Sequence, residues 1–262
     1  MPRKRGTLYT LFFAAVVCVF CAVLVSVSAV TLKPRQIANK STDKQKNVLL
    51  AGGLISPEDT LRGPEIAQMF ERRVHPIVVA RSNGRVLTAE DALGYDQRAA
   101  MGDPAESDAA PPNKAKVARL PKKLLVYQVQ SGSALEMVIL PVQGKGLWST
   151  LYGFLALDGG DPRVIRGIAF YEQGETPGLG GEVDNPKWRA LWPGRRALDK
   201  NLEPVFSLKK GGAGSAKEDP YHVDALTGAT MTSNGVTALV QFWLGPNGYG
   251  PYLNRLVERS GK

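Results

Sequence analysis

The sequence predicts an α+β fold, with an N-terminal transmembrane helix followed by a domain of a mostly antiparallel sheet and flanking helices. The first supporting observation is that Thr7 to Val30 contains no charged residue. The second is a set of four apolar runs between residues 124 and 171, separated by Gly, Asp and Pro, as in strands joined by hairpins. The third is that strand-like runs outnumber helical ones and cluster together, which is typical of α+β domains.

The uncharged segment predicts a membrane anchor. As a helix, Thr7 to Val30 would be about 36 Å long, enough to cross a hydrocarbon core of about 30 Å. Residues 1–6 carry Arg3, Lys4 and Arg5, so the positive-inside rule keeps the N-terminus in the cytoplasm. The rest would lie outside, in the periplasm of a Gram-negative host, held by a single pass through the inner membrane. A cleaved signal peptide ending at Val27-Ser28-Ala29 is the alternative, although the apolar run is longer than usual.

Charge and cysteine content exclude several functions. The chain has 262 residues and a net charge of +9, but no Lys/Arg block with interleaved aromatics, so we expect no nucleic-acid binding. Cys18 and Cys21 both lie within the predicted anchor, where small apolar side chains are common. We therefore expect them to be structural. His75 and His222 lack nearby cysteines, and we expect no metal site.

The first part of the exported domain is predicted as follows. Residues 31–47 are polar and predict a stalk, so that the domain spans 48–262. Ser56-Pro57-Glu58 predicts a helix start, with Ser as N-cap. Val74–Ala80 and Arg85–Leu87 are predicted strands, and Asn83-Gly84 between them predicts a hairpin.

The segment 90–116 differs in composition from its surroundings. It is rich in Ala, Pro, Asp and Ser and poor in large aliphatic residues, which predicts a mobile surface insertion. From Leu124 onward, apolar runs that predict strands and helices follow one another more closely. The predicted strands are Leu124–Val129, Leu135–Val142, Leu151–Leu157, Val164–Tyr171 and Val205–Leu208. The predicted helices begin near Asp184, at Asn234 and at Pro251.

The segment Asp224-Ala-Leu-Thr-Gly-Ala-Thr230 suggests a phosphate site. Gly228 permits a sharp turn, and Ala229 leaves the Thr230 side chain unobstructed. The Thr230 hydroxyl would stand just before a helix, whose free N–H groups and dipole favour phosphate. The alternative is a simple turn in which Thr232 or Ser233 is an N-cap, and the pattern alone does not exclude it.

This segment resembles the recognition motif of bacterial flavin transferases, D-x-x-[ST]-G-A-[TS]. Met231 to Val236, which includes Thr232 and Ser233, resembles the C subunits of the Na⁺-translocating NADH:quinone reductases. The resemblance implies that a flavin transferase moves FMN from FAD to the hydroxyl of Thr230, forming a phosphoester. It also implies that Asp224 supports recognition or modification, and that Thr227, Gly228 and Ala229 shape the loop.

Two further segments resemble the same family in the expected order. Glu175-Thr176-Pro177-Gly178-Leu179-Gly180 resembles the E-T-P-G-L-G loop of FMN-binding domains, and Gly178 and Gly180 would expose backbone N–H groups near the ring. Pro141 to Gly153 resembles the stretch P-V-x-G-K-G-L-W-S of this family. There Lys145 could meet the flavin phosphate or the reduced ring, and Trp148 could lie near the ring. A solvated Lys145 and a core Trp148 are equally compatible with the sequence.

The resemblance implies an electron-transfer component of a six-subunit membrane complex that oxidises NADH, reduces quinone and pumps sodium. In it, the flavin would take electrons from an intramembrane iron centre and pass them to the FMN of the B subunit. The main partners would be this B subunit and the membrane subunits D and E. The related alternative is the flavin protein of the Rnf ferredoxin:NAD oxidoreductase, against which Gly144 to Ser149 argues. A stand-alone exported FMN-binding module and a structural anchor with a chance motif are the remaining alternatives.

Overall fold

The computed structural model describes residues 6–88, 92, 94–132 and 134–260. The basic residues 3–5 and residues 90, 91 and 93 of the predicted insertion lie outside this range. The chain divides into two units, residues 1–43 and 44–262. The first unit is formed by most of helix α1 (Thr7–Ala51), whose most apolar window has a mean hydropathy of 2.8 over 18 residues. By length and composition this window could cross a membrane. The helix also includes the predicted stalk.

The second unit is built on a five-stranded sheet in the described part of the chain, with strand order β1-β4-β5-β6-β7 and every neighbouring pair antiparallel. This confirms the predicted fold class. Its strands are β1 (Val74–Ala80), β4 (Lys123–Ser131), β5 (Ala134–Lys145), β6 (Thr150–Asp158) and β7 (Ile165–Glu172). Small strand pairs flank it, namely β2 (Ser107–Ala109) with β3 (Arg119–Pro121), and β8 (Ser207–Lys209) with β9 (His222–Asp224).

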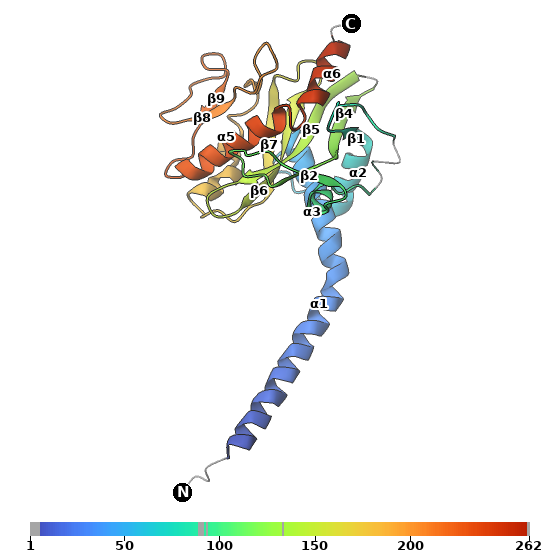
Figure 1. The fold of residues 1–262 in the computed structure, drawn as a ribbon, viewed down its shortest axis with the longest axis vertical. Coiled ribbons are helices and arrows are strands. Elements are labelled where there is room, and N and C mark those ends of the chain that lie inside the picture. The colour runs from blue at the N-terminus through green and yellow to red at the C-terminus, as the bar shows by residue number, and fades with distance from the viewer. Residues whose placement is uncertain (1–5, 89–91, 93, 133, 261–262) are drawn as a thin grey trace. The chain divides into compact units, whose positions relative to one another are not determined.

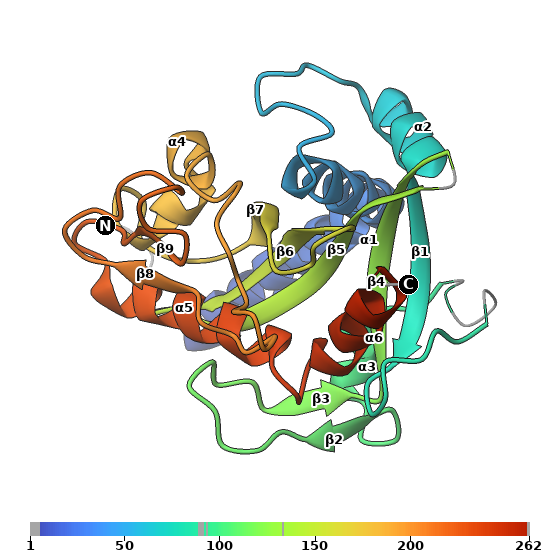
Figure 2. The ribbon, with the colours of Figure 1, turned by 90° about the horizontal axis from the view of Figure 1, so that it is seen from above.

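Helices cover both faces of this sheet (Figure 2). Helices α5 (Thr230–Leu244) and α6 (Gly250–Ser260) lie over one face, and α2 (Gly63–Arg73) with the end of α1 lies over the other. Successive residues of β4 and β5 therefore enter different cores. Val126 and Leu140 pack on the α5 side, whereas Leu125 and Ile139 pack on the α1 side. Burial on both faces explains why these strands read as continuous apolar runs.

The first predicted helix starts later than its cap signal indicated. Ser56 forms a turn instead, in which its N–H donates to the Asp59 carboxylate at 2.7 Å. Helix α2 begins at Gly63, and the N–H of Arg62 donates to the Glu65 side chain at 2.7 Å. Pro64 in the first turn sets the start, because it needs no N–H partner there. The predicted strand at residues 85–87 contributes a single bridge, Val79 to Val86.

The segment predicted as a mobile insertion packs against the domain over its described part. It forms α3 (Gln97–Gly102) and β2, and Met101 and Ala115 are buried in the core under α5. The Gln97 side chain accepts a hydrogen bond from the N–H of Leu125 in β4 at 2.7 Å. One methionine, one alanine and one amide side chain thus supply contacts that a count of large aliphatics overlooks.

The fold places three segments of interest at one end of the sheet. The loop at residues 146–149 closes the β5–β6 hairpin, and the N–H of Gly146 donates to the carbonyl of Ser149 at 2.8 Å. The loop after β7 leads into a short 3₁₀ turn (Gly180–Asp184) and then α4 (Pro186–Arg189). Helix α5 lies across the β5–β6 hairpin (Figure 1). At Gly235, a Cβ atom would clash with the carbonyl oxygen of Lys145.

Candidate flavin site

Thr230 is the first residue of α5, and its side chain is exposed. The helix therefore begins four residues before the predicted start at Asn234. Gly228 precedes it with φ +72°, a left-handed conformation that side chains rarely adopt. The first N–H groups of a helix have no partner within it and carry partial positive charge. Thr230 thus presents a hydroxyl where a phosphate group would be stabilised.

The loop before Thr230 is fixed by its own residues. The Ser233 hydroxyl donates to the carbonyl of Ala229 at 3.0 Å and accepts from the N–H of Leu226 at 3.0 Å. Ser233 is buried, so these bonds are shielded from water. The Asp224 carboxylate accepts from the N–H of Ala213 at 2.6 Å, and it therefore ties the end of β9 to a neighbouring loop. Thr227 is exposed at the turn.

Glu175 connects the three segments. Its carboxylate accepts hydrogen bonds from the N–H groups of Leu147 (3.0 Å), Trp148 (2.9 Å) and Ser149 (2.9 Å) in the hairpin loop. It also accepts from the Thr232 hydroxyl in the first turn of α5, at 2.6 Å. Since Glu175 belongs to the loop after β7 and is only 5% exposed, one buried side chain joins the hairpin loop, its own loop and the start of α5.

These hydrogen bonds determine the charge state of Glu175. Burial by itself raises the pKa of the carboxyl group, because it disfavours the charged form. The hydrogen bonds from Thr232 and from the hairpin-loop N–H groups outweigh burial, so the pKa of Glu175 lies below its ordinary value. Glu175 is therefore ionised at neutral pH and accepts charge-assisted hydrogen bonds, which are stronger than neutral ones.

The loop after β7 needs its glycines for close packing. A Cβ atom at Gly180 would lie 2.6 Å from the Thr232 hydroxyl oxygen. Gly178 has φ +76°, and the carbonyl of Thr176 accepts from the N–H of Leu179 at 3.1 Å to close the turn. A Cβ atom at Gly228 would lie 2.9 Å from a methyl group of Leu179. The loop after β7 therefore touches the segment that carries Thr230.

Exposed apolar side chains come from these same segments. Among the described residues after α1, the large hydrophobic side chains that stay exposed are Val86, Leu147, Trp148, Leu179 and Met231. All but Val86 belong to the hairpin loop, the loop after β7 or the first turn of α5. Trp148 is 69% and Met231 59% exposed, so Trp148 is not a core residue. Exposed apolar side chains gathered in this way often mark a binding site.

Lys145 is directed to its own loop. Its ammonium group donates to the carbonyl of Trp148 at 2.9 Å, while its backbone N–H donates to the carbonyl of Ala115 at 2.8 Å. The ammonium group thus supports the turn that exposes Trp148.

The structure brings most of the predicted site residues to one place, but not all. Glu175, Gly180 and Thr232 are in direct contact, and Leu179 adjoins Gly228. The Asp224 carboxylate and the Lys145 ammonium group instead bond within the protein. Sequence reasoning missed Ser149, whose hydroxyl donates to Glu175 at 3.2 Å, and also missed Leu147 and Met231. They lie within the motifs, yet nothing in the pattern distinguishes them from ordinary loop residues.

The site suits FMN, the cofactor that the sequence resemblance implies. A phosphate on Thr230 would meet the positive end of α5. Trp148, Leu179 and Met231 would offer apolar contacts to a planar ring, and Gly178, with open space around it, leaves its backbone accessible. The buried carboxylate of Glu175 is fully used by protein donors, so it need not face the cofactor's phosphate.

Comparisons with known proteins agree with this site. Residues 146–245 match the family model described as "FMN-binding domain". The chain is 44% identical over 259 residues to the C subunit of the Na⁺-translocating NADH-quinone reductase of Pseudomonas aeruginosa, covering 98% of both chains. It is 40% identical to the corresponding protein of Yersinia pestis, covering 100% of this chain and 97% of the other. The crystal structure of Shewanella oneidensis NqrC superposes with a TM-score of 0.75 at 34% identity, covering 83% of this chain and 98% of the other.

Proposed function

Because the chain belongs to the family of the C subunits of Na⁺-translocating NADH-quinone reductases, we propose that Thr230 carries its FMN through a phosphoester bond. In this proposal the chain is the electron-transfer component of a membrane complex that oxidises NADH, reduces quinone and translocates sodium. The family model and the relatives support a flavoprotein. The attachment position is inferred from the site.

The exposed hydroxyl of Thr230 at the start of α5 is the observation that carries the proposal. In attachment, the Thr230 oxygen forms a bond to the phosphorus of the FMN half of FAD. The bond between that phosphorus and the bridging oxygen breaks, AMP leaves with the bonding electrons, and the hydroxyl releases its proton. A flavin transferase would catalyse this step. An exposed threonine at the start of a helix can enter the active site of such an enzyme.

The residues around Thr230 would hold the cofactor and shape its surroundings. FMN supplies the redox chemistry, since it can pass electrons one at a time. The first N–H groups of α5 would stabilise the phosphate, and Trp148, Leu179 and Met231 would exclude water from part of the ring. Glu175 acts indirectly, because it holds together the loops that carry these side chains. The protein needs no general acid or base for this role.

The apolar window of α1 supports a membrane location. We infer that it crosses the inner membrane once, with the N-terminus in the cytoplasm and the flavin domain in the periplasm. The partners would be the other subunits of the complex, above all the FMN-bearing B subunit and the membrane-embedded D and E subunits. The proposed electron path runs from an intramembrane iron centre, through the flavin on Thr230, to the FMN of the B subunit.

The attachment is tested by ultraviolet fluorescence of the denatured protein in a gel, after expression with and without flavin transferase. We expect a fluorescent band for the wild type only when the transferase is present, and no band for Thr230→Val. Thr230→Ser should keep the band because it retains the hydroxyl, and Thr60→Val serves as the matched control at an exposed position outside the site. A dark wild-type band with active transferase, or a bright Thr230→Val band, would refute the attachment.

A further inference from the structure

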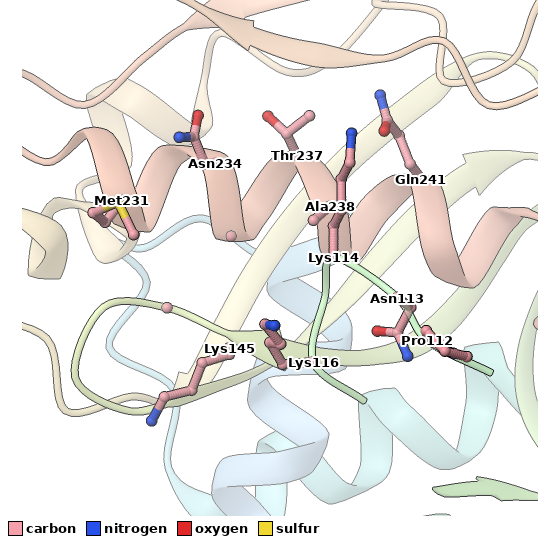
Figure 3. A pocket seen from close by; sticks show the side chains of 12 residues that line it. Pro112, Asn113, Lys114, Lys116, Lys145, Met231, Asn234, Thr237, Ala238 and Gln241 are labelled. Carbon is pink, nitrogen blue, oxygen red and sulfur yellow. The ribbon is translucent and has the colours of Figure 1, made fainter. Parts of the chain in front are cut away.

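A pocket of about 900 Å³ lies beside the flavin site, between α5 and the loop at residues 112–116 (Figure 3). Its volume falls within the range of about 300–1,000 Å³ typical of small-molecule sites. Met231, which follows Thr230 in the sequence, lies at one end of the pocket, and Gln241 lines it further along α5. Thr230 itself is not among the lining residues. The pocket is therefore a neighbour of the attachment position rather than part of it.

The loop wall of this pocket is held rigidly. The Asn113 side chain donates to the carbonyls of Pro111 and Val117, each at 2.8 Å, and accepts from the N–H of Val117 at 3.0 Å. Ala115 is fully buried, and its carbonyl accepts from the N–H of Lys145 in β5. The side chains before and after Ala115 are therefore presented from a hydrogen-bonded backbone.

Lys114 and Lys116 are those two side chains. Both are exposed and line the pocket, and within the described part of the chain neither forms a hydrogen bond or an ion pair. Lys116 has φ +56°, a left-handed conformation that is unfavourable for a residue with a side chain. Strain of this kind often accompanies a functional site. The ammonium group of Lys145, the third lysine of the pocket, is bound to the carbonyl of Trp148.

The opposite wall adds an uncharged donor and apolar surface. Asn234 on α5 is exposed, and no hydrogen bond engages its side chain among the residues that the structure describes. Met231 and Ala238 supply apolar surface. None of the described lining residues is acidic. Two cations without a bonding partner in the described part of the chain and an unused amide on the neighbouring helix line a concave, partly apolar site. Such a lining matches a ligand with an anionic group and an uncharged body.

We propose that this pocket binds a small organic anion of nucleotide-monophosphate size. Its phosphate group would lie against Lys114 and Lys116, and its uncharged body would contact Met231 and Ala238 next to α5. The oxyanion could belong to a soluble molecule or to the flavin on Thr230. We assign it to a soluble molecule, because Thr230 does not line the pocket. The segment for which the sequence suggested no function thus forms half of a binding site.

One consequence rests on the proposed function. If FMN is attached at Thr230, an anion bound beside Met231 opposes the negative charge that reduction adds to the flavin. The bound anion would then lower the midpoint potential of the flavin, and reduction would weaken anion binding by the same factor. This provides a second measurement, separate from binding itself.

The binding test is isothermal titration calorimetry on the full-length flavinylated chain in detergent, with adenosine monophosphate as probe and inorganic phosphate as reference. We expect one adenosine monophosphate per chain, bound more tightly than inorganic phosphate because its body contacts the apolar wall. The double variant Lys114→Gln/Lys116→Gln should bind it at least about tenfold more weakly, since two charge-assisted contacts are lost. Lys200→Gln/Lys217→Gln, which removes two exposed charges away from the pocket, should bind like the wild type.

The controls distinguish the two sources of the anion and the two proposals. Thr230→Val, which lacks the flavin, should bind adenosine monophosphate as the wild type does. Binding by Thr230→Val but not by the flavinylated chain would mean that the flavin fills the pocket, and would overturn the soluble ligand. Absence of binding at about 10 mM adenosine monophosphate, or equal binding by the Lys114→Gln/Lys116→Gln variant, would overturn the site itself. Gel fluorescence of the same samples reports the attachment independently.

Discussion

Replacing Glu175 by Gln should loosen the flavin site without changing its shape. The carboxylate accepts from three backbone N–H groups and two hydroxyls, belonging to Leu147, Trp148, Ser149 and Thr232. An amide of the same size has one acceptor oxygen, and its NH₂ group would face either Leu147 or the pair Trp148 and Ser149. At least one buried N–H group then loses its partner.

The magnitude follows from these bonds. An unsatisfied buried donor costs about 1–3 kcal/mol, and each remaining bond weakens by about 0.5–1 kcal/mol when its acceptor loses its charge. The free energy of unfolding should therefore fall by about 3 kcal/mol, which for a domain of this size lowers the melting temperature by about 6–12 °C. Glu203→Gln, at an exposed glutamate whose side chain has no bond of this kind, is the matched control and should change little.

The pH dependence gives the same prediction a second readout. Because the pKa of Glu175 is lower in the folded than in the unfolded chain, the unfolded chain binds its proton first as the pH falls. The stabilisation from its charge is therefore complete above the ordinary value of 4.5 and is lost as the pH falls through the lowered pKa. The difference in melting temperature between the wild type and Glu175→Gln should become smaller below about pH 4.5.

Thermal unfolding by circular dichroism in detergent, from neutral pH to pH 3, measures both effects, and gel fluorescence of the same samples measures flavin attachment. We expect less attached flavin in Glu175→Gln, because the loops beside Thr230 are no longer held together. The role of Glu175 would be refuted if Glu175→Gln had unchanged flavin content and melted within about 1 °C of the Glu203→Gln control. Such a difference in melting temperature corresponds to less than about 0.5 kcal/mol.

Three further predictions address packing and the flavin environment. Gly180→Ala places a Cβ atom 2.6 Å from the Thr232 hydroxyl oxygen. It should therefore lower the free energy of unfolding, measured by denaturant titration, by about 1–3 kcal/mol. Gly102→Ala, with open space around it, is the control and should not lower the free energy of unfolding. Trp148→Ala should leave the melting temperature unchanged, because the side chain is 69% exposed, but should shift the absorption spectrum of the attached flavin; an unchanged spectrum would remove Trp148 from the site. Tyr249→Phe removes the hydroxyl that lies 3.0 Å from the carbonyl oxygens of Leu125 and Pro141. The free energy of unfolding, measured by thermal unfolding, should fall by about 1–2 kcal/mol. A fall below about 0.5 kcal/mol, which is the usual scatter of surface substitutions, would contradict this.

Elements with local signals in the sequence were predictable. The strands of the main sheet were predictable because burial on both faces demands apolar side chains at successive positions, and runs such as those in β4 and β5 show this directly. The turn at Gly228 and the helix after it follow from glycine's access to positive φ. The uncharged stretch of α1 is likewise a local property.

Features that depend on contacts between residues distant in the chain were not predictable in this way. The boundary of α2 was settled by competition between two possible caps, and the segment 97–116 became ordered through contacts with β4 and β5 that its composition does not reveal. Glu175 reads as part of a glycine-rich loop, yet its partners lie 26 to 57 residues away. A hydrogen bond needs a distance and a direction, and folding alone brings the hairpin loop and α5 within reach of that carboxylate. The pocket beside Lys114 and Lys116 exists for the same reason, since its two walls come from segments that meet only in the folded chain.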